Sequence, residues 1–149
     1  MSMRQMTASS AECWVGYSLK NVQHRLRRRL EEKLAGAHIS ASQNAALLAI
    51  GENPRISNAS LARAAFVTPQ SMQSMLVTLE RDGFIVRTPH PKHGRIIMTE
   101  LTRKGRTTAH AGMMAAEAVE RQMLSDLTDD EADLLRDLLR RCADALERG

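Results

Sequence analysis

The sequence predicts a mainly α-helical fold with one small β-hairpin, in which a helix-turn-helix and the hairpin are flanked by longer helices. Apolar residues recur at spacings of three and four along most of the chain, which is the periodicity of helices packed on one face. Residues that start helices precede several of these runs, most clearly at Thr68-Pro69 and at Thr128. Between residues 84 and 101, two short β-prone runs flank a turn rich in proline and glycine.

The first predicted helix runs from Cys13 to Leu34 and ends at Gly36, which can adopt the left-handed conformation of a C-terminal cap. Its apolar stripe consists of Val15, Leu19, Val22, Leu26 and Leu30. Arginines at positions 25, 27, 28 and 29 crowd the same helix. Two interpretations of these arginines stay open, a solvated face and a surface that contacts phosphate.

Two shorter helices are predicted next. The second helix runs from about Ser42 to Ile50, and the residues that stop it are Gly51, Asn53 and Pro54. Ser57 or Asn58 can cap the third helix. The side chains of the third helix expected to face inward are Leu61, Ala62, Ala65 and Phe66.

The fourth predicted helix has the clearest boundaries. Thr68 is a good N-cap, Pro69 suits the first helical position, and Gly83 ends the helix. Its inward positions at helical spacing are Met72, Met75, Leu76 and Leu79. The outward face is then almost uncharged and carries Gln70, Ser71, Gln73, Ser74, Val77 and Thr78.

A hairpin and two long helices complete the chain. The strands are predicted at Phe84 to Thr88 and Arg95 to Leu101, around the tip Pro89-His90-Pro91-Lys92-His93-Gly94. Thr102 can cap a helix from Arg103 to Leu124, and Thr128 with Glu131 forms a capping box for the last helix. The last helix has an apolar stripe at Leu135, Leu138, Leu139, Cys142 and Leu146.

Length and composition bound the function. A chain of 149 residues suits one domain, and its N-terminus has no apolar core typical of a signal peptide, so a cytoplasmic protein with separate thiols at Cys13 and Cys142 is expected. The net charge is +4, with cations concentrated in residues 84–106 and most acids after them. This asymmetry favours an anionic partner for the middle of the chain. Aromatic residues make up only 3%, which argues against base-stacking platforms for single strands.

A helix-turn-helix followed by a basic hairpin has the chemistry of a double-stranded DNA reader. The major groove admits an α-helix, and Gln, Ser and Thr side chains hydrogen-bond base edges there. Arginine on a hairpin suits a narrow minor groove.

The sequence resembles the MarR family of winged-helix transcriptional regulators. The segments that carry the resemblance are Thr68-Pro69-Gln70-Ser71-Met72, Leu79-Glu80-Arg81-Asp82-Gly83-Phe84-Ile85-Val86-Arg87, Gly94-Arg95 and Leu101-Thr102-Arg103-Lys104-Gly105. The resemblance implies one domain over residues 1–149, with dimerisation helices at 11–35 and 103–147 and a winged-helix DNA-binding lobe at 40–102. It further implies a homodimer on a pseudo-palindromic operator, with half-sites about 10 bp apart, acting as a repressor that a small aromatic or phenolic effector releases. No cofactor is implied.

Individual DNA contacts also follow from the resemblance. The base-reading candidates are Gln70, Ser71, Gln73 and Ser74, and the candidates for phosphate or minor-groove contacts are Thr68, Arg87, Lys92, His93 and Arg95. Arg95 corresponds to the wing-tip arginine of the family. His93 stands where the family usually carries an aspartate that orients this arginine, so two outcomes stay open, a more loosely held wing or a wing affinity that depends on pH near about 6–7. Thr78 replaces a residue that is basic in many relatives, which removes one potential phosphate contact.

Several alternatives stay open. Cys13 with Tyr17 resembles the peroxide-sensing branch of the family, although Cys13 can equally be a small buried residue. Trp14 and Tyr17 are either part of an effector pocket or core residues. The histidines and Cys142 have no spacing typical of a zinc site, and the wing histidines are expected to face phosphate or solvent. No motif indicates an enzyme, and the main alternative to a DNA regulator is a winged-helix module that binds protein.

Overall fold

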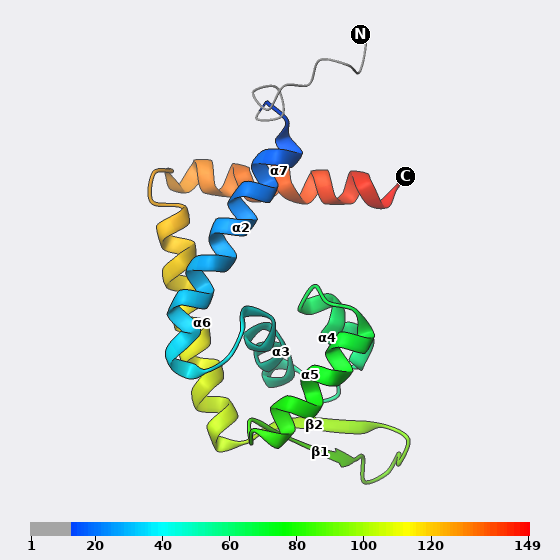
Figure 1. Cartoon of the computed structure of the whole chain (residues 1–149). Coiled ribbons are helices and arrows are strands. Elements are labelled where there is room, and N and C mark those ends of the chain that lie inside the picture. Colours follow the sequence, from blue (N-terminus) through cyan, green and yellow to red (C-terminus); the bar gives the residue numbers. More distant parts are fainter. Residues whose placement is uncertain (1–12) are drawn as a thin grey trace, which may run out of the picture.

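The computed structural model describes residues 13–149 and confirms the predicted fold class (Figure 1). The elements are α2 (Val15–Leu34), a 3-10 turn (Ala35–Ala37), α3 (Ala41–Glu52), α4 (Asn58–Ala64), α5 (Pro69–Arg81), β1 (Ile85–Pro89), β2 (Ile97–Leu101), α6 (Arg103–Met123) and α7 (Asp129–Glu147). Helices α2 and α6 pack side by side, and α7 runs across from the end of α6. Helices α3, α4 and α5 and the hairpin form a lobe that packs through α3 against α6, toward the end of α6 that follows the hairpin.

The end of α2 differs from the prediction. The chain leaves α2 through the 3-10 turn, and His38, not Gly36, takes the left-handed conformation with φ of 55°. The backbone N–H of His38 donates to the Ala35 carbonyl, so the 3-10 turn satisfies part of the helix end.

Helix α3 is longer than predicted, because Ser40 starts it and Gly51 does not stop it. Ser40 Oγ accepts from the Gln43 N–H at 3.1 Å, and Gln43 Oε1 accepts from the Ser40 N–H at 2.8 Å, which is a complete capping box. A Cβ at Gly51 would lie 3.2 Å from Leu101 Cδ1. Gly51 therefore gives β2 room to approach α3, and Asn53 caps the helix instead.

The core of the lobe lies between α3, α4, α5 and the hairpin. Its fully buried large side chains are Leu34, Leu47, Ile50, Leu61, Met72, Leu79 and Ile85. Asn44 is also buried, and its Nδ2 lies 3.5 Å from the Gly112 carbonyl on α6. A Cβ at Gly112 would lie 1.8 Å from Asn44 Oδ1, so glycine allows α3 and α6 to pack this closely.

Phe66 contradicts the prediction that it faces the core. Its side chain is 95% exposed, and its backbone φ is 54°. The left-handed conformation turns the chain sharply between α4 and α5, and this reversal directs the ring into solvent. The neighbouring prediction for Leu61, Ala62 and Ala65 is confirmed, since all three are buried.

The hairpin is antiparallel. Its first strand is shifted by one residue from the prediction, and its second strand begins two residues later than predicted. Ile85 pairs with Leu101 at the base and Pro89 pairs with Ile97 near the tip, so Phe84 and Arg95 lie outside the strands. Thr102 then caps α6 and donates its hydroxyl to the Gly83 carbonyl at 2.6 Å. A Cβ at Gly105 would lie 1.9 Å from the Phe84 carbonyl oxygen, so glycine is required where α6 begins against the hairpin.

Large apolar side chains on α2 and α7 are exposed in the single chain. Trp14 and Tyr17 are 60% and 46% exposed, which contradicts the core-packing interpretation of both residues. Other exposed members of this surface, here called the α2–α7 apolar surface, are Val15, Leu19, Val22, Leu134, Leu135, Leu138, Leu139 and Leu146. Within residues 13–149, no helix combines the length and apolar character needed to cross a membrane.

Candidate nucleic-acid interface

Helix α5 presents the polar face that the sequence predicts. Thr68 Oγ1 accepts from the Ser71 N–H at 3.1 Å and lies 2.9 Å from Ser71 Oγ, which fixes the first turn. Gln70, Ser71, Gln73, Ser74 and Val77 are exposed. Thr78 is half-buried and donates its hydroxyl to the Ser74 carbonyl at 3.2 Å, so its hydrogen bond stays within the helix.

A groove of about 510 Å³ lies between α5, the hairpin and the loop before α4. It brings together three residues that the sequence singles out, Gln73 from α5 and Arg87 and Arg95 from the hairpin. It also contains Arg55 and Asn58, which sequence reasoning missed. The positive charge of Arg55 is the one signal in the sequence that could have indicated a role at the groove. Its position there depends on the tertiary fold, which brings the loop before α4 next to the hairpin.

Asn58 joins the two helices of the helix-turn-helix at this groove. Its Nδ2 donates to the Pro69 carbonyl at 3.1 Å, and its Oδ1 has no hydrogen-bond partner among the described residues. The amide therefore holds the start of α5 against the start of α4. Ser57, not Asn58, is the N-cap of α4, because its Oγ accepts from the Ser60 N–H at 3.1 Å.

Arg87 is bound to Glu80 on α5. Its Nη2 and Nε donate to Glu80 Oε2 at 2.8 and 3.1 Å, and its backbone N–H donates to Glu80 Oε1 at 3.2 Å. Such a bidentate pair fixes direction as well as distance. We call it the Glu80–Arg87 clamp, since it holds β1 at a fixed angle to α5.

The wing tip differs from the prediction at His90. Its ring is buried, and Nδ1 accepts from the N–H groups of Lys92 and His93 at 3.1 and 3.2 Å. The expectation that both wing histidines face phosphate or solvent is therefore wrong for His90, whereas His93 is exposed. Lys92 and Arg95 are exposed as well, and neither forms an ion pair with a carboxylate in the part of the chain that is described.

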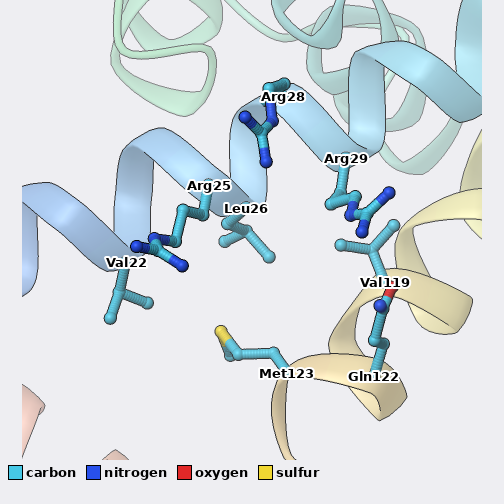
Figure 2. Close-up of a pocket in the computed structure, with 8 residues that line it drawn as sticks. All are labelled: Val22, Arg25, Leu26, Arg28, Arg29, Val119, Gln122 and Met123. Carbon is cyan, nitrogen blue, oxygen red and sulfur yellow. The ribbon is translucent and has the colours of Figure 1, made fainter.

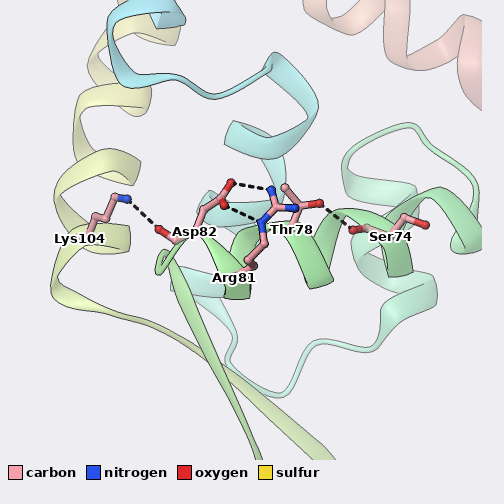
Figure 3. A network of polar contacts seen from close by, with 5 residues as sticks. All are labelled: Ser74, Thr78, Arg81, Asp82 and Lys104. Carbon is pink, nitrogen blue, oxygen red and sulfur yellow. Dashed lines mark hydrogen bonds and ion pairs between the residues drawn. The ribbon is translucent and has the colours of Figure 1, made fainter.

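A second polar network lies at the end of α5 (Figure 3). Arg81 Nε donates to Asp82 Oδ1 at 2.9 Å, and this bond lowers the pKa of the Asp82 carboxyl and raises that of Arg81. Lys104 Nζ donates to the Asp82 carbonyl at 2.7 Å and lies 4.4 Å from the centre of the Phe84 ring. A cation at this position complements the negative end of the α5 dipole and ties α6 to the recognition helix.

A separate pocket of about 310 Å³ lies between α2 and α6 (Figure 2). Its apolar side chains are Val22, Leu26, Val119 and Met123, and its polar ones are Arg25, Arg28, Arg29 and Gln122. Arg25 donates to Asn21, and Arg28 and Arg29 share Glu32 at 3.7 and 3.1 Å. Trp14 and Tyr17, the residues predicted for an effector pocket, do not line it.

The remaining predicted sites involve sulfur and metal. Cys13 and Cys142 are both exposed free thiols, so the interpretation of Cys13 as a small buried residue is wrong. Residues 13–149 contain no cluster of three or more histidine, cysteine or acidic side chains that could hold a metal ion. Residues 1–12, including the polar start of the chain, lie outside the described part.

Comparison with known proteins identifies similar regulators. Residues 39–96 match the MarR family. The chain is 32% identical over 114 residues to the HTH-type transcriptional repressor Rv2887 of Mycobacterium tuberculosis, which covers 76% of this chain and 82% of the relative. The structure of Rv2887 with salicylic acid superposes with a TM-score of 0.72 at 28% identity, covering 87% of this chain and 96% of that one. The structure of the transcriptional repressor CouR bound to a 23-mer DNA duplex superposes with a TM-score of 0.80 at 26% identity. This match covers 93% of this chain and 99% of that one.

Proposed function

This chain belongs to the MarR family of winged-helix transcriptional regulators, and from that premise we propose that it is a dimeric, sequence-specific DNA-binding repressor that a small aromatic anion releases. The observation that carries the proposal is the groove in which the uncharged face of α5 meets Arg95 of the hairpin and Arg55 of the loop before α4, neither of which is paired with a carboxylate among residues 13–149. The groove combines base-reading amides with cations for phosphate, and this combination suits duplex DNA better than a protein partner. The same proposal places the protein in the cytoplasm, with its DNA.

In this proposal, one part of the chain binds DNA and another part forms the dimer. We assign residues 40–102 to the DNA-binding lobe, and α2 together with residues 103–147 to dimerisation; residues 11 and 12 of the predicted first helix lie outside the described part. The α2–α7 apolar surface supports dimerisation, because a second copy would bury leucines and aromatics that one chain leaves in water. A two-fold dimer presents two α5 helices to successive major grooves, which requires a pseudo-palindromic operator.

Each predicted DNA contact has a defined role in this proposal. Exposed amides and hydroxyls on α5 form hydrogen bonds with base edges in the major groove. The residues that supply these groups are Gln70, Ser71, Gln73 and Ser74. Thr68 orders the first turn and lies at the phosphate, where the backbone N–H of Gln70 is the remaining donor, because Ser71 and Met72 donate to Thr68 and Pro69 has no N–H. Arg95 enters the minor groove, with Lys92 and His93 on the flanking backbone. Arg87 acts through the clamp, since its guanidinium is already occupied by Glu80.

The pocket between α2 and α6 is the proposed effector site. Its apolar floor fits an aromatic ring, and the guanidinium of Arg25, which is free of carboxylate partners among residues 13–149, fits a carboxylate. Rv2887 was solved with salicylic acid, so salicylate is a suitable probe. An effector with a ~100-fold preference for a conformation that cannot bind DNA supplies about 2.7 kcal/mol toward release.

Fluorescence anisotropy tests the proposal directly. The purified protein is titrated onto a duplex from its own upstream region and onto a scrambled duplex, across a salt series. We expect one dimer per duplex, a specificity ratio above ~10³ and affinity that falls as salt rises. Absence of binding to either duplex at low salt, and to random-sequence DNA in a selection, would favour the protein-binding alternative.

Two substitutions test the contact assignments. Gln73→Ala is expected to cost about 1–3 kcal/mol and to relax specificity at one base pair. Arg95→Ala is expected to weaken binding and reduce the salt slope by about one. The matched control is Arg121→Ala, which removes an exposed arginine near the far end of α6 and is expected to leave DNA binding unchanged.

A further inference from the structure

The wing tip is organised around one imidazole ring. His90 Nδ1 accepts hydrogen bonds from two successive backbone N–H groups, those of Lys92 and His93, at 3.1 and 3.2 Å. The His93 N–H also points to the His90 carbonyl at 3.3 Å, and the His90 N–H donates to the Ile96 carbonyl at 2.8 Å. The ring is only 9% exposed and lies beside the His93 ring, with 5.2 Å between the ring centres.

This geometry fixes the protonation state that the tip requires. A nitrogen that accepts a hydrogen bond carries no proton, so the ring is neutral and its proton is on Nε2. The imidazole therefore accepts hydrogen bonds from the backbone N–H groups two and three residues later. The side-chain oxygen of asparagine plays the same part in an Asx-turn.

We propose that His90 is the positioning residue of the wing tip, and that only its neutral form holds Lys92 and Arg95 in the arrangement that meets DNA. The inference rests on the proposed DNA-binding function. Protonation of Nδ1 removes the acceptor for the N–H groups of Lys92 and His93. These two donors then face a third donor, the new Nδ1–H of His90. The turn that orders Lys92, His93 and Arg95 then loses its internal support.

Among residues 13–149, no carboxylate forms an ion pair with His90. The charged and titratable side chains of the tip are Lys92, His93 and Arg95, and Arg55 faces the same groove from the loop before α4. Glu80 is bound to Arg87, and Glu100 pairs in register with Val86 near the base of the hairpin. A second positive charge at His90 would therefore lie among cations. The two hydrogen bonds of the tip are present when His90 is neutral and are lost when Nδ1 is protonated.

The first test follows the tip without DNA. Amide proton and nitrogen shifts of Lys92 and His93 are recorded by NMR between pH 8 and 5 in the full chain and in three variants. His90→Asn keeps an acceptor near the position of Nδ1 but cannot titrate, His90→Ala removes the acceptor, and His93→Asn removes the neighbouring exposed histidine. We expect both amides to shift with pH in the wild type and in His93→Asn, whereas His90→Asn keeps only the smaller part of the shift that His93→Asn removes.

The second test measures DNA binding with the same proteins. The probe is a duplex selected from random-sequence DNA by the wild-type protein at pH 8. We expect the wild type to lose about tenfold in affinity relative to His90→Asn between pH 8 and 5.5, because two hydrogen bonds of the tip are lost. His90→Ala is expected to bind weakly at every pH. His93→Asn lacks one proposed backbone contact and binds more weakly at pH 8, but between pH 8 and 5.5 it is expected to lose affinity by the same factor as the wild type.

The two tests separate the failure of each proposal. Amide shifts that are independent of pH in the wild type, or an affinity of His90→Asn that falls as steeply as that of the wild type, would overturn the role of His90. Failure to select any duplex at pH 8 would overturn the DNA-binding function. In that case the amide shifts still decide whether His90 controls the tip.

Discussion

The Glu80–Arg87 clamp gives the sharpest prediction about how the recognition helix and the wing act together. The perturbation is a double-mutant cycle of Glu80→Ala, Arg87→Ala and the double variant. The side chains are 39% and 21% exposed, so the pair is neither a free surface contact nor a buried one. Exposed pairs contribute about 0.2–1 kcal/mol, and truncating one partner of a buried pair costs about 3–5 kcal/mol. Two short bonds to one carboxylate oxygen place the expected coupling energy at about 1–2 kcal/mol.

Urea unfolding at a fixed protomer concentration measures this coupling, because unfolding of a dimer depends on concentration. Glu100→Ala is the matched control, since it removes a carboxylate from the same hairpin without touching the clamp. A coupling below about 0.3 kcal/mol would refute the reasoning, because the two side chains would then act independently.

DNA binding supplies a second readout of the same variants. Glu80→Ala releases the Arg87 guanidinium and adds one positive charge to the groove. Binding to scrambled DNA is therefore expected to tighten, while binding to the operator weakens because β1 is no longer held against α5. Glu100→Ala changes the net charge equally and is expected to leave the ratio of operator to scrambled affinity unchanged.

Three further predictions concern stability and are checked by chemical denaturation. Gly112→Ala is expected to cost about 2–3 kcal/mol by overlap with Asn44 Oδ1, and Asn44→Ala in the same chain should restore most of the loss; an unaltered midpoint for Gly112→Ala would contradict the contact. Phe66→Gly is expected to stabilise the folded state by about 0.5–1 kcal/mol. It removes the strain of about 1–2 kcal/mol that a left-handed L-residue carries, but about half of this gain is offset because glycine gives the unfolded chain more conformational entropy. Phe66→Ala keeps the strain and should change little. Asp82→Asn is expected to lower stability slightly at pH 7, because a carboxyl with a lowered pKa stabilises the folded state above its unfolded pKa of about 3.9. This difference is expected to disappear in acid, as the pH falls through the lowered folded pKa; an equal difference at pH 7 and in acid would contradict this.

Features encoded by neighbouring residues could be predicted from the sequence. The caps at Thr68, Thr102 and Thr128 are confirmed, because an N-cap needs only a side chain and an N–H two or three residues later. The polar face of α5 follows from helical spacing alone. The MarR resemblance also depends on short ordered motifs, and the matches to known regulators confirm it.

Features that depend on tertiary geometry could not be predicted in this way. Phe66 has an apolar side chain at a helical spacing, but its left-handed backbone reverses the direction of that side chain. Arg87 is a cation in a basic segment, yet the fold brings Glu80 close enough to bind it. Trp14 and Tyr17 have large apolar side chains, yet the fold of one chain leaves them 60% and 46% exposed.

Helix α6 connects the proposed effector pocket directly to the wing. Val119, Gln122 and Met123 near its end line the pocket, and Thr102 at its start is bonded to the Gly83 carbonyl beside the hairpin. A helix of 21 residues at about 1.5 Å per residue is about 30 Å long. A tilt of about 5° at the pocket end moves the other end by about 2.7 Å, which is close to the length of one hydrogen bond. Binding of a single aromatic ring in the pocket is therefore expected to displace α5 and the hairpin from the DNA through a small tilt of α6. No helix of the chain has to unfold for this displacement.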